Sequence, residues 1–318
     1  MRKGQNPAKF VNTVAKPSDI TVAVLSYIPY QSGFYANTLQ VLDTCLKSIR
    51  NETQLDFDLL VFDNGSCENV QKYLLEEKAR GNIQFLILSE KNLGKGGAWN
   101  IIFDAAPGKL IAYADSDIYF HKDWLSKSKE ILDIYPNVGM VTARPYITDQ
   151  KFNTNTLEWA NSREDVIAES GKLLSWENIS SFLLSLGRTE EEIINEFESN
   201  DVTRLTFKEK GAIVGASHWQ FLTRKETIIK FLPFDMSRPM GQVNRLDQRM
   251  NEERLLRLMT PEVLVDNLSN TLEKNSFESI KNKKNKQKKF IYKLLDLPFV
   301  KPVLLFIHHR IFLVYFDR

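Results

Sequence analysis

Two aspartates separated by one residue, Asp115 and Asp117, directly follow the short apolar run 110–114. Such a run predicts a buried strand, and open α/β sheets hold their ligands at the carboxyl ends of their strands. Two carboxylates this close repel each other unless a cation neutralises them, and Mg²⁺ or Mn²⁺ commonly bridges carboxylates to phosphate oxygens. A solvated turn explains an isolated Asp-x-Asp pair more often, so the metal–diphosphate interpretation depends on the rest of the chain.

Three further segments in the same half of the chain support that interpretation. Residues 20–27 are rich in β-branched and apolar side chains and predict a first strand, and the apolar run 58–62 predicts a second strand that ends at Asp63. The glycine-rich segment 92–100 predicts a tight turn that continues as a helix. All four segments occur in this order within about the first 120 residues.

In this order, the segments resemble the nucleotide-sugar-binding half of family 2 glycosyltransferases, which have the GT-A fold. The matching residues are Asp63, Gly65 and Ser66 of a D-x-G-S pattern, Asn92, Gly94, Ala98 and Asn100 of an N-x-G-x-x-x-A-x-N pattern, and Asp115 and Asp117 of a D-x-D pattern. The resemblance covers residues 20–145 well and residues 211–270 loosely. It implies an enzyme that uses a nucleotide-sugar donor.

The resemblance implies a role in donor binding for several residues. Asp63 stands where the family reads the nucleotide base, and Asn92, Gly94 and Asp115 belong to the other donor-binding motifs. Lys95 is a candidate counter-charge for the diphosphate, although a surface role is the simpler explanation of a lysine. A carboxylate accepts a hydrogen bond from a base N–H, which favours uracil or thymine over cytosine. The expected donor is a UDP- or dTDP-sugar.

The family takes its general base from a later acidic motif, usually Glu-Asp at the start of a helix. Asp247 is the candidate here, although Leu246 stands where Glu is usual. Asp235 is the alternative candidate, and a capping or turn role explains it equally well. The general base takes the proton of the acceptor hydroxyl as the bond to the anomeric carbon forms.

The same resemblance implies a metal cofactor, Mg²⁺ or Mn²⁺, held by Asp117 with Asp115 in support. A bound metal acts as a Lewis acid on the departing diphosphate. Asn267 occupies the position at which many relatives carry an additional histidine ligand. His218 is a candidate to approach the metal from another loop, although a lone histidine is more often structural.

The expected reaction is therefore transfer of a sugar, with inversion, to a hydroxyl of a glycan or lipid-linked acceptor. Two other functions remain open. A sugar nucleotidyltransferase shares the sheet, but it needs a glycine-rich loop after the first strand, and residues 27–33 lack that glycine density. A non-catalytic binding domain of the same fold is favoured by the imperfect base motif and opposed by the retention of Asp63, Asp115 and Asp117 together.

Composition and charge narrow the class of protein. The 318 residues carry a formal net charge of +2, and 26% of them are charged, which argues against a nucleic-acid binder driven by bulk charge. The two cysteines, Cys45 and Cys67, suggest neither a disulfide framework nor a zinc site. Residues 1–16 lack the apolar core of a secretory signal, so a cytoplasmic location is expected.

Alternating patterns predict the fold class, an α/β GT-A-like protein with a mostly parallel sheet and helices on both faces. The predicted strands are 20–27, 58–62, 83–88, 110–114 and 138–142, and the predicted helices are 37–50, 69–80, 97–106 and 124–135. The predicted organisation is an N-terminal extension (1–18), a catalytic domain (19–270) and a basic and apolar tail (271–318). The catalytic domain divides into a donor half (19–145), a helical insertion (146–210) and an acceptor half (211–270).

The tail combines the lysine-rich run 281–289 with apolar and aromatic segments that reach residue 316. No uninterrupted apolar stretch attains the roughly 18 residues of a confident membrane span. Basic residues beside apolar ones suit an anionic membrane surface, which would place the enzyme peripherally at the inner face of the membrane. A helix docked on the catalytic domain or on a second subunit explains the tail equally well.

Overall fold

A computed structural model of the chain describes residues 3–238 and 242–272. In the first part of the chain the elements are β1 (Ile20–Ser26), α1 (Thr38–Glu52), β2 (Asp58–Asn64), α2 (Glu68–Ala79), β3 (Phe85–Ser89), α3 (Gly94–Ala105), β4 (Leu110–Asp115), β5 (Ile118–Phe120), α4 (Trp124–Ile134) and β6 (Val138–Thr142). They are followed by α5 (Thr154–Asn161), β7 (Val166–Gly171), α6 (Trp176–Ser185), α7 (Glu190–Ser199), β8 (Val202–Phe207), β9 (Lys210–Val214), β10 (Gln220–Arg224), α8 (Lys225–Ile228), α9 (Gln242–Glu252), β11 (Leu256–Met259) and β12 (Val265–Asn267).

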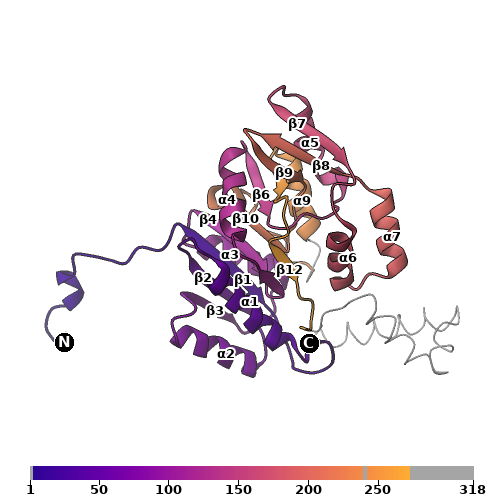
Figure 1. The fold of residues 1–318 in the computed structure, drawn as a ribbon. Helices are drawn as coiled ribbons and strands as arrows, with labels where there is room; N and C mark the ends of the chain where they lie inside the picture. Colours follow the sequence, from indigo (N-terminus) through magenta and orange to yellow (C-terminus); the bar gives the residue numbers. More distant parts are fainter. Residues whose placement is uncertain (1–2, 239–241, 273–318) are drawn as a thin grey trace, which may run out of the picture. The chain divides into compact units, whose positions relative to one another are not determined.

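The central sheet has ten strands in the order β3-β2-β1-β4-β10-β6-β11-β9-β8-β7 (Figure 1). β3, β2, β1 and β4 run parallel, as do β6 and β11, whereas β10 pairs antiparallel between β4 and β6. Each predicted strand corresponds to an observed one, and each predicted helix overlaps one of α1 to α4. The predicted α/β class is confirmed.

Alternate residues of the parallel strands pack into two separate hydrophobic cores, because successive side chains of a strand point to opposite faces. On one face, Val22, Val24, Leu59 and Val61 pack with residues of α1, α2 and α4. On the other face, residues such as Ala23, Leu60 and Tyr113 pack with α3 and α9. Cys45 of α1 is fully buried in the first core, as a small hydrophobic residue.

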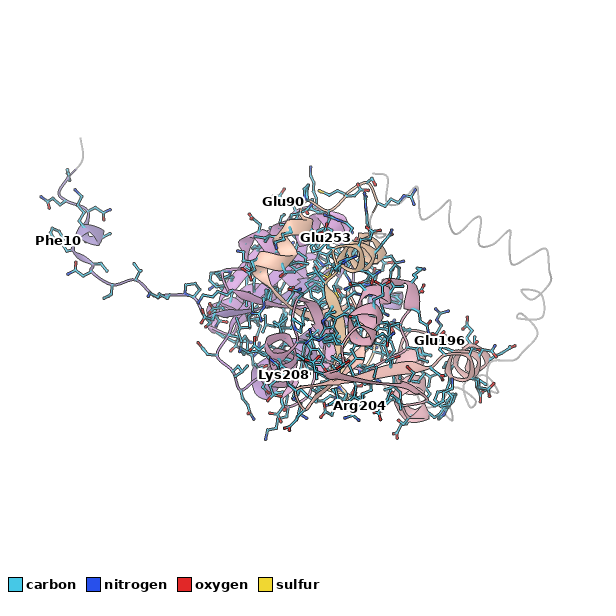
Figure 2. The ribbon with its side chains drawn as sticks, turned by 90° about the horizontal axis from the view of Figure 1, so that it is seen from above. Phe10, Glu90, Glu196, Arg204, Lys208 and Glu253 are labelled. Carbon is cyan, nitrogen blue, oxygen red and sulfur yellow. The ribbon has the colours of Figure 1, made fainter. Side chains whose placement is uncertain are left out.

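The segment predicted as a helical insertion, 146–210, holds α5, α6 and α7 and also the strands β7 and β8. β7, β8 and β9 form an antiparallel meander that lengthens the sheet beyond β11. The turn between β8 and β9 has positive φ at Lys208 (47°) and Glu209 (62°), as tight two-residue hairpins require. Figure 2 shows Arg204 and Lys208 of this hairpin and Glu196 of α7 at the periphery of the domain.

The acidic run at the start of α7 has a structural role at its third position. Thr189 caps the helix, with its hydroxyl accepting from the Glu192 backbone N–H at 3.3 Å. The Glu192 carboxylate accepts from the Thr189 backbone N–H at 2.8 Å, which completes a capping box.

No helix within the described ranges is long and apolar enough to cross a membrane. The predicted tail, 271–318, lies outside the described residues from position 273 onward, so its membrane role stays a prediction.

The turn after β2 depends on a glycine that no other residue replaces without strain. Gly65 has φ +86°, and a Cβ there would lie 3.0 Å from the backbone nitrogen of Asn92. The side chain of the preceding residue, Asn64, accepts from the Leu93 N–H at 2.8 Å and donates to the Asn92 side-chain oxygen at 3.0 Å. The β2 turn and the loop before α3 are thus held together at van der Waals distance.

We expect Gly65→Ala to lower the free energy of unfolding more than Gly81→Ala does. Gly81 has a similar φ, +80°, but has nothing within 4 Å of its Cβ position. Gly81→Ala therefore carries only the left-handed backbone cost, about 1–2 kcal/mol, whereas Gly65→Ala adds a backbone clash. Urea unfolding of both variants measures the difference, and equal losses would show that the contact between the two loops is not tight.

Candidate active site

The strand register brings the predicted donor-binding residues to one edge of the sheet. Ser26 pairs with Asp63, and Leu25 pairs with Asp115, so the carboxyl ends of β1, β2 and β4 are level. Asp63 lies on the face covered by α1, α2 and α4, and Asp115 lies on the face covered by α3, because register partners share a face. A ligand that contacts both must lie across the edge of the sheet.

Asp115 is held from two sides. Its Oδ2 accepts from Lys95 Nζ at 2.7 Å, and its Oδ1 accepts from the Tyr113 hydroxyl at 2.6 Å. Lys95 comes from the first turn of α3 and lies 5.5 Å from the Trp99 ring centre. Lys95 is only 10% exposed, so the structure places this lysine inside the predicted donor site.

Asp117 follows the last residue of β4 by two positions and has no ion-pair partner within the described residues. Burial and the neighbouring negative charge of Asp115 raise the pKa of the Asp117 carboxyl to about 7, and Lys95 opposes this shift. Its backbone oxygen accepts from Leu268 N–H at 2.7 Å, which fixes the loop. A cation bound beside Asp117 would relieve the electrostatic cost of its ionised form.

The residues present fit a divalent cation that shares its ligands with a substrate. Mg²⁺ usually binds through one or two carboxylates together with phosphate oxygens and water. Asp117 offers a carboxylate without a competing ion pair, and Asp115 offers a second one that Lys95 now holds. Within the described residues there is no group of three or more His, Cys, Asp or Glu side chains able to hold a metal by themselves.

Asp63 is fully buried at the end of β2. Its Oδ2 accepts from the Ser66 backbone N–H at 3.0 Å and from Gln71 at 3.4 Å, whereas its Oδ1 is buried without a hydrogen-bond partner in the described structure. Burial raises the pKa of Asp63, and the hydrogen bonds from Ser66 and Gln71 lower it in part. An unpaired buried acceptor next to the ligand-binding edge is suited to an incoming N–H donor.

Asn92 and Gly94 shape the loop before α3. The Asn92 side-chain oxygen accepts from the Gly94 backbone N–H at 2.8 Å, and Gly94 has φ +67°. Both hydrogen bonds of the Asn92 oxygen are internal to the protein, so this residue supports the position of Lys95 rather than presenting a free group.

Asp247, the predicted general base, lies on α9 and is 5% exposed. Its Oδ1 lies 2.8 Å from Arg257 Nη2, an ion pair without hydrogen-bond geometry, and its Oδ2 lies 3.3 Å from His218 Nδ1. The structure therefore joins His218, which was a candidate metal ligand, to the candidate base. The His218 side chain is 27% exposed.

Asp235, the alternative base, is exposed and caps its own turn. Hydrogen bonds from the Ser237 hydroxyl (2.7 Å) and backbone N–H (2.9 Å) lower its pKa. The adjacent Phe234 exchanges two hydrogen bonds with the Asn100 side chain, at 2.6 and 3.0 Å. The last asparagine of the N-x-G-x-x-x-A-x-N pattern thus attaches the segment of Asp235 to α3.

Asn267 lies opposite Ile118, because β12 pairs antiparallel with β5. Its side-chain oxygen accepts from the Ser269 N–H at 2.6 Å. The neighbouring Asp266 pairs with buried Arg144 and with His121 Nε2, the latter at 2.7 Å. This cluster of charged residues was not predicted. The only sign of it in the sequence is one arginine, Arg144, within a largely apolar segment.

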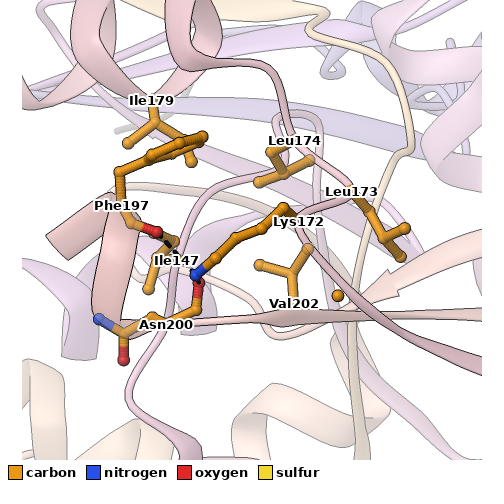
Figure 3. Close-up of a pocket in the computed structure, with 9 residues that line it drawn as sticks. Ile147, Lys172, Leu173, Leu174, Ile179, Phe197, Asn200 and Val202 are labelled. Atoms are coloured by element: carbon orange, nitrogen blue, oxygen red, sulfur yellow. Dashed lines mark hydrogen bonds between the residues drawn. The ribbon is translucent and has the colours of Figure 1, made fainter. Parts of the chain in front are cut away.

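A small apolar pocket lies in the insertion (Figure 3). Ile147, Leu174, Ile179, Phe197 and Val202 are among the residues that line it. Lys172 at its rim donates to the carbonyl oxygens of Phe197, Glu198 and Asn200 at 2.7–2.9 Å. A lysine at a helix carboxyl end satisfies free carbonyls there, which explains this residue without a ligand.

Comparison with known proteins finds several relatives. Curated relatives include the uncharacterized glycosyltransferase alr2836 of Nostoc sp., 27% identical over 42% of this chain and 40% of its own length. They also include the chondroitin synthase of Escherichia coli, 23% identical over 58% of this chain and 27% of its own length. The chain thus spans less than half the length of the curated relatives it matches.

Two solved structures are also similar at 14% sequence identity. S. aureus TarS 1-349 has a TM-score of 0.43 and matches 76% of this chain and 57% of its own. The mannosyltransferase PcManGT from Pyrobaculum calidifontis, in complex with GDP-Man and Mn2+, has a TM-score of 0.46 and matches 78% and 56%.

The family model described as Glycosyl transferase family 2 matches residues 34–196. The match covers slightly more than half of the 318 residues and includes the motifs at Asp63, Asn92 and Asp115. The chain therefore belongs to glycosyl transferase family 2.

Proposed function

We propose that this protein is a metal-dependent glycosyltransferase that moves a sugar from a nucleoside-diphosphate donor to a hydroxyl of a glycan or lipid-linked acceptor. The observation that carries the proposal is the Asp115–Asp117 pair at the carboxyl edge of β4, with Lys95 at 2.7 Å from Asp115. Two carboxylates and the ammonium group of Lys95 at one edge of the sheet suit a diphosphate and a divalent metal. Inversion is implied by the family resemblance alone.

Binding of the donor requires the Lys95–Asp115 ion pair either to break or to be shared with the diphosphate and the cation. A diphosphate gives Lys95 a new anionic partner, and Asp115 is then available to the cation that Asp117 would hold. The metal would supply Lewis-acid stabilisation of the departing diphosphate. The residues of the chain bind and orient the donor so that its anomeric carbon faces the acceptor side.

Asp63 provides the proposed preference for the base. Its unpaired Oδ1 accepts from the N–H of a uracil or thymine ring, whereas cytosine presents an acceptor at the corresponding position. The proposed donor is therefore a UDP- or dTDP-sugar. Two relatives in this family, the chondroitin synthase of Escherichia coli and the amylovoran biosynthesis glycosyltransferase AmsB of Erwinia amylovora, carry names that refer to polysaccharides, which supports a glycan acceptor.

We expect Asp117→Asn to abolish the effect of Mn²⁺ on nucleotide binding. In the wild type, UDP with Mn²⁺ should raise the melting temperature above the value with UDP alone, because a ligand of the native state stabilises it. Asp117→Asn should lose this increment, and transfer should fall about 100-fold or more, since metal stabilisation contributes several kcal/mol. Asp104→Asn, an exposed carboxylate on α3, is the control and should behave as wild type. Full activity of Asp117→Asn in EDTA would contradict metal dependence.

We expect Asp63→Asn to gain unfolding free energy relative to the wild type, and we expect this gain to grow as the pH increases. The folded protein binds the Asp63 proton more tightly than the unfolded chain, because burial raises the pKa of this carboxyl. The cost of the buried charge is therefore absent below about pH 4, the ordinary range of aspartate, and complete above the raised pKa. Thermal unfolding between pH 4 and 8 measures the difference, which a constant offset at all pH values would contradict.

The same variant should lose affinity for the nucleotide. In Asp63→Asn, the amide oxygen takes over the Ser66 hydrogen bond, so an N–H group replaces the free acceptor at the base edge. UDP binding measured by calorimetry should weaken by about 1–3 kcal/mol, the range for a lost hydrogen bond to a charged group. CDP binding should change less, and equal losses for the two nucleotides would remove Asp63 from base recognition.

A further inference from the structure

Asp247 is enclosed, and its contacts leave it little access to a substrate. The residue is 5% exposed, with Arg257 Nη2 at 2.8 Å from Oδ1 and His218 Nδ1 at 3.3 Å from Oδ2. Arg257 is 1% exposed and is fixed by the carbonyl oxygens of Ala216 (2.7 Å) and Phe152 (2.9 Å). A carboxylate held in this way cannot turn toward an acceptor hydroxyl without breaking a buried ion pair, which leaves the Arg257 charge buried without its partner.

His218 is the exposed member of this group. Its side chain is 27% exposed, and its contact with Asp247 uses Nδ1, which leaves Nε2 for another partner. The next residue, Trp219, accepts a hydrogen bond from the Asp115 backbone N–H at 2.8 Å. The imidazole therefore belongs to the loop that adjoins the proposed donor site directly.

We propose that His218 accepts the proton of the acceptor hydroxyl and that Asp247 is a positioning residue, an assignment that rests on the proposed glycosyl transfer. As the acceptor oxygen bonds to the anomeric carbon, its proton passes to Nε2 of His218. The bond from the anomeric carbon to the diphosphate oxygen breaks, and its electron pair leaves with the diphosphate. The imidazolium is stabilised by the Asp247 carboxylate and then releases its proton to solvent.

Arg257 makes this assignment testable through the tautomer of His218. A guanidinium only donates hydrogen bonds, so in Asp247→Asn the amide oxygen faces Arg257 and the amide NH₂ group faces His218. His218 must then accept at Nδ1 and carry its proton on Nε2. That tautomer cannot take a proton from the acceptor, although the shape of the site is retained.

The first test is a two-dimensional ¹H–¹⁵N spectrum of the histidine rings of the full chain, recorded without ligand. The resonances of His218 are those that disappear in His218→Gln. Where the ring carries one proton, we expect that proton on Nδ1 in the wild type and on Nε2 in Asp247→Asn. The same tautomer in both proteins would overturn the assignment.

The second test is the release of UDP from UDP-glucose and UDP-N-acetylglucosamine with Mn²⁺, with water as the acceptor. His218→Gln and Asp247→Asn should each lower kcat by about 10²–10⁴-fold, the usual range for a general base, with KM for the donor unchanged. Imidazole added to His218→Ala should restore part of the loss, and it should not restore Asp117→Asn. Asp104→Asn, an exposed carboxylate on α3, is the control and should leave kcat unchanged.

The two proposals fail in different ways. If the wild type releases UDP but His218→Gln is as active as Asp104→Asn, the role of His218 is wrong and the proposed function stands. If the wild type neither binds nor cleaves any nucleotide sugar, the proposed function fails, and the role of His218 fails with it whatever tautomer the spectra show.

Discussion

Concentrated negative charge at the carboxyl edge of the sheet is the constraint on which the rest of this structure depends. One of these carboxylates, Asp63, lies at the end of β2, and the other two, Asp115 and Asp117, lie at the end of β4 and just after it. Each of the three has different neighbours. Asp115 is paired with Lys95, whereas Asp63 accepts hydrogen bonds with one oxygen and has no partner for the other among the residues described. Asp117 has a pKa raised to about 7 because burial and Asp115 disfavour its charge. Negative charge on these carboxylates that no side chain of the protein neutralises is therefore available to a ligand.

Two buried arginines hold the second half of the site together. Arg257 joins β11 to Asp247 of α9 and to the Ala216 loop, and Arg144 joins the segment after β6 to Asp266 of β12 and to α6. Burial lowers the pKa of Arg144, and Asp266 opposes that shift. Removing one partner of such a pair leaves an uncompensated buried charge, at a cost of about 3–5 kcal/mol. The acceptor side is thus fixed by long-range ion pairs rather than by apolar packing alone.

The donor half could be predicted from the sequence because its elements are local. Buried parallel strands produce continuous apolar runs, and each run in 20–114 ends at a residue that the register places on the same edge. The position of β10 between β4 and β6 could not be predicted, since strand order depends on pairing between distant segments. The partners of Asp247 could not be predicted either. Arg257 follows Asp247 by ten residues and lies on another element, and His218 precedes Asp247 by 29 residues. The sequence identified both Asp247 and His218 as candidate site residues, but it did not show that they are in contact.

This difference in locality has a consequence for how the two halves can change. The donor half is tied together by contacts that stay within residues 20–120, such as the hydrogen bonds of Asn64 to the Asn92 loop. The acceptor half is joined to it by the pairing of β10 with β4 and of β12 with β5, and by hydrogen bonds of Asn100 with Phe234 and of the Asp115 N–H with Trp219. The insertion adds β7 and β8 at the edge of the sheet farthest from β3, so substitutions there can alter the acceptor side while the pairing of β4 around Asp115 is retained. The His218–Asp247–Arg257 group lies in the acceptor half next to the junction of β10 with β4, which is where a proton acceptor has to be for both substrates to meet.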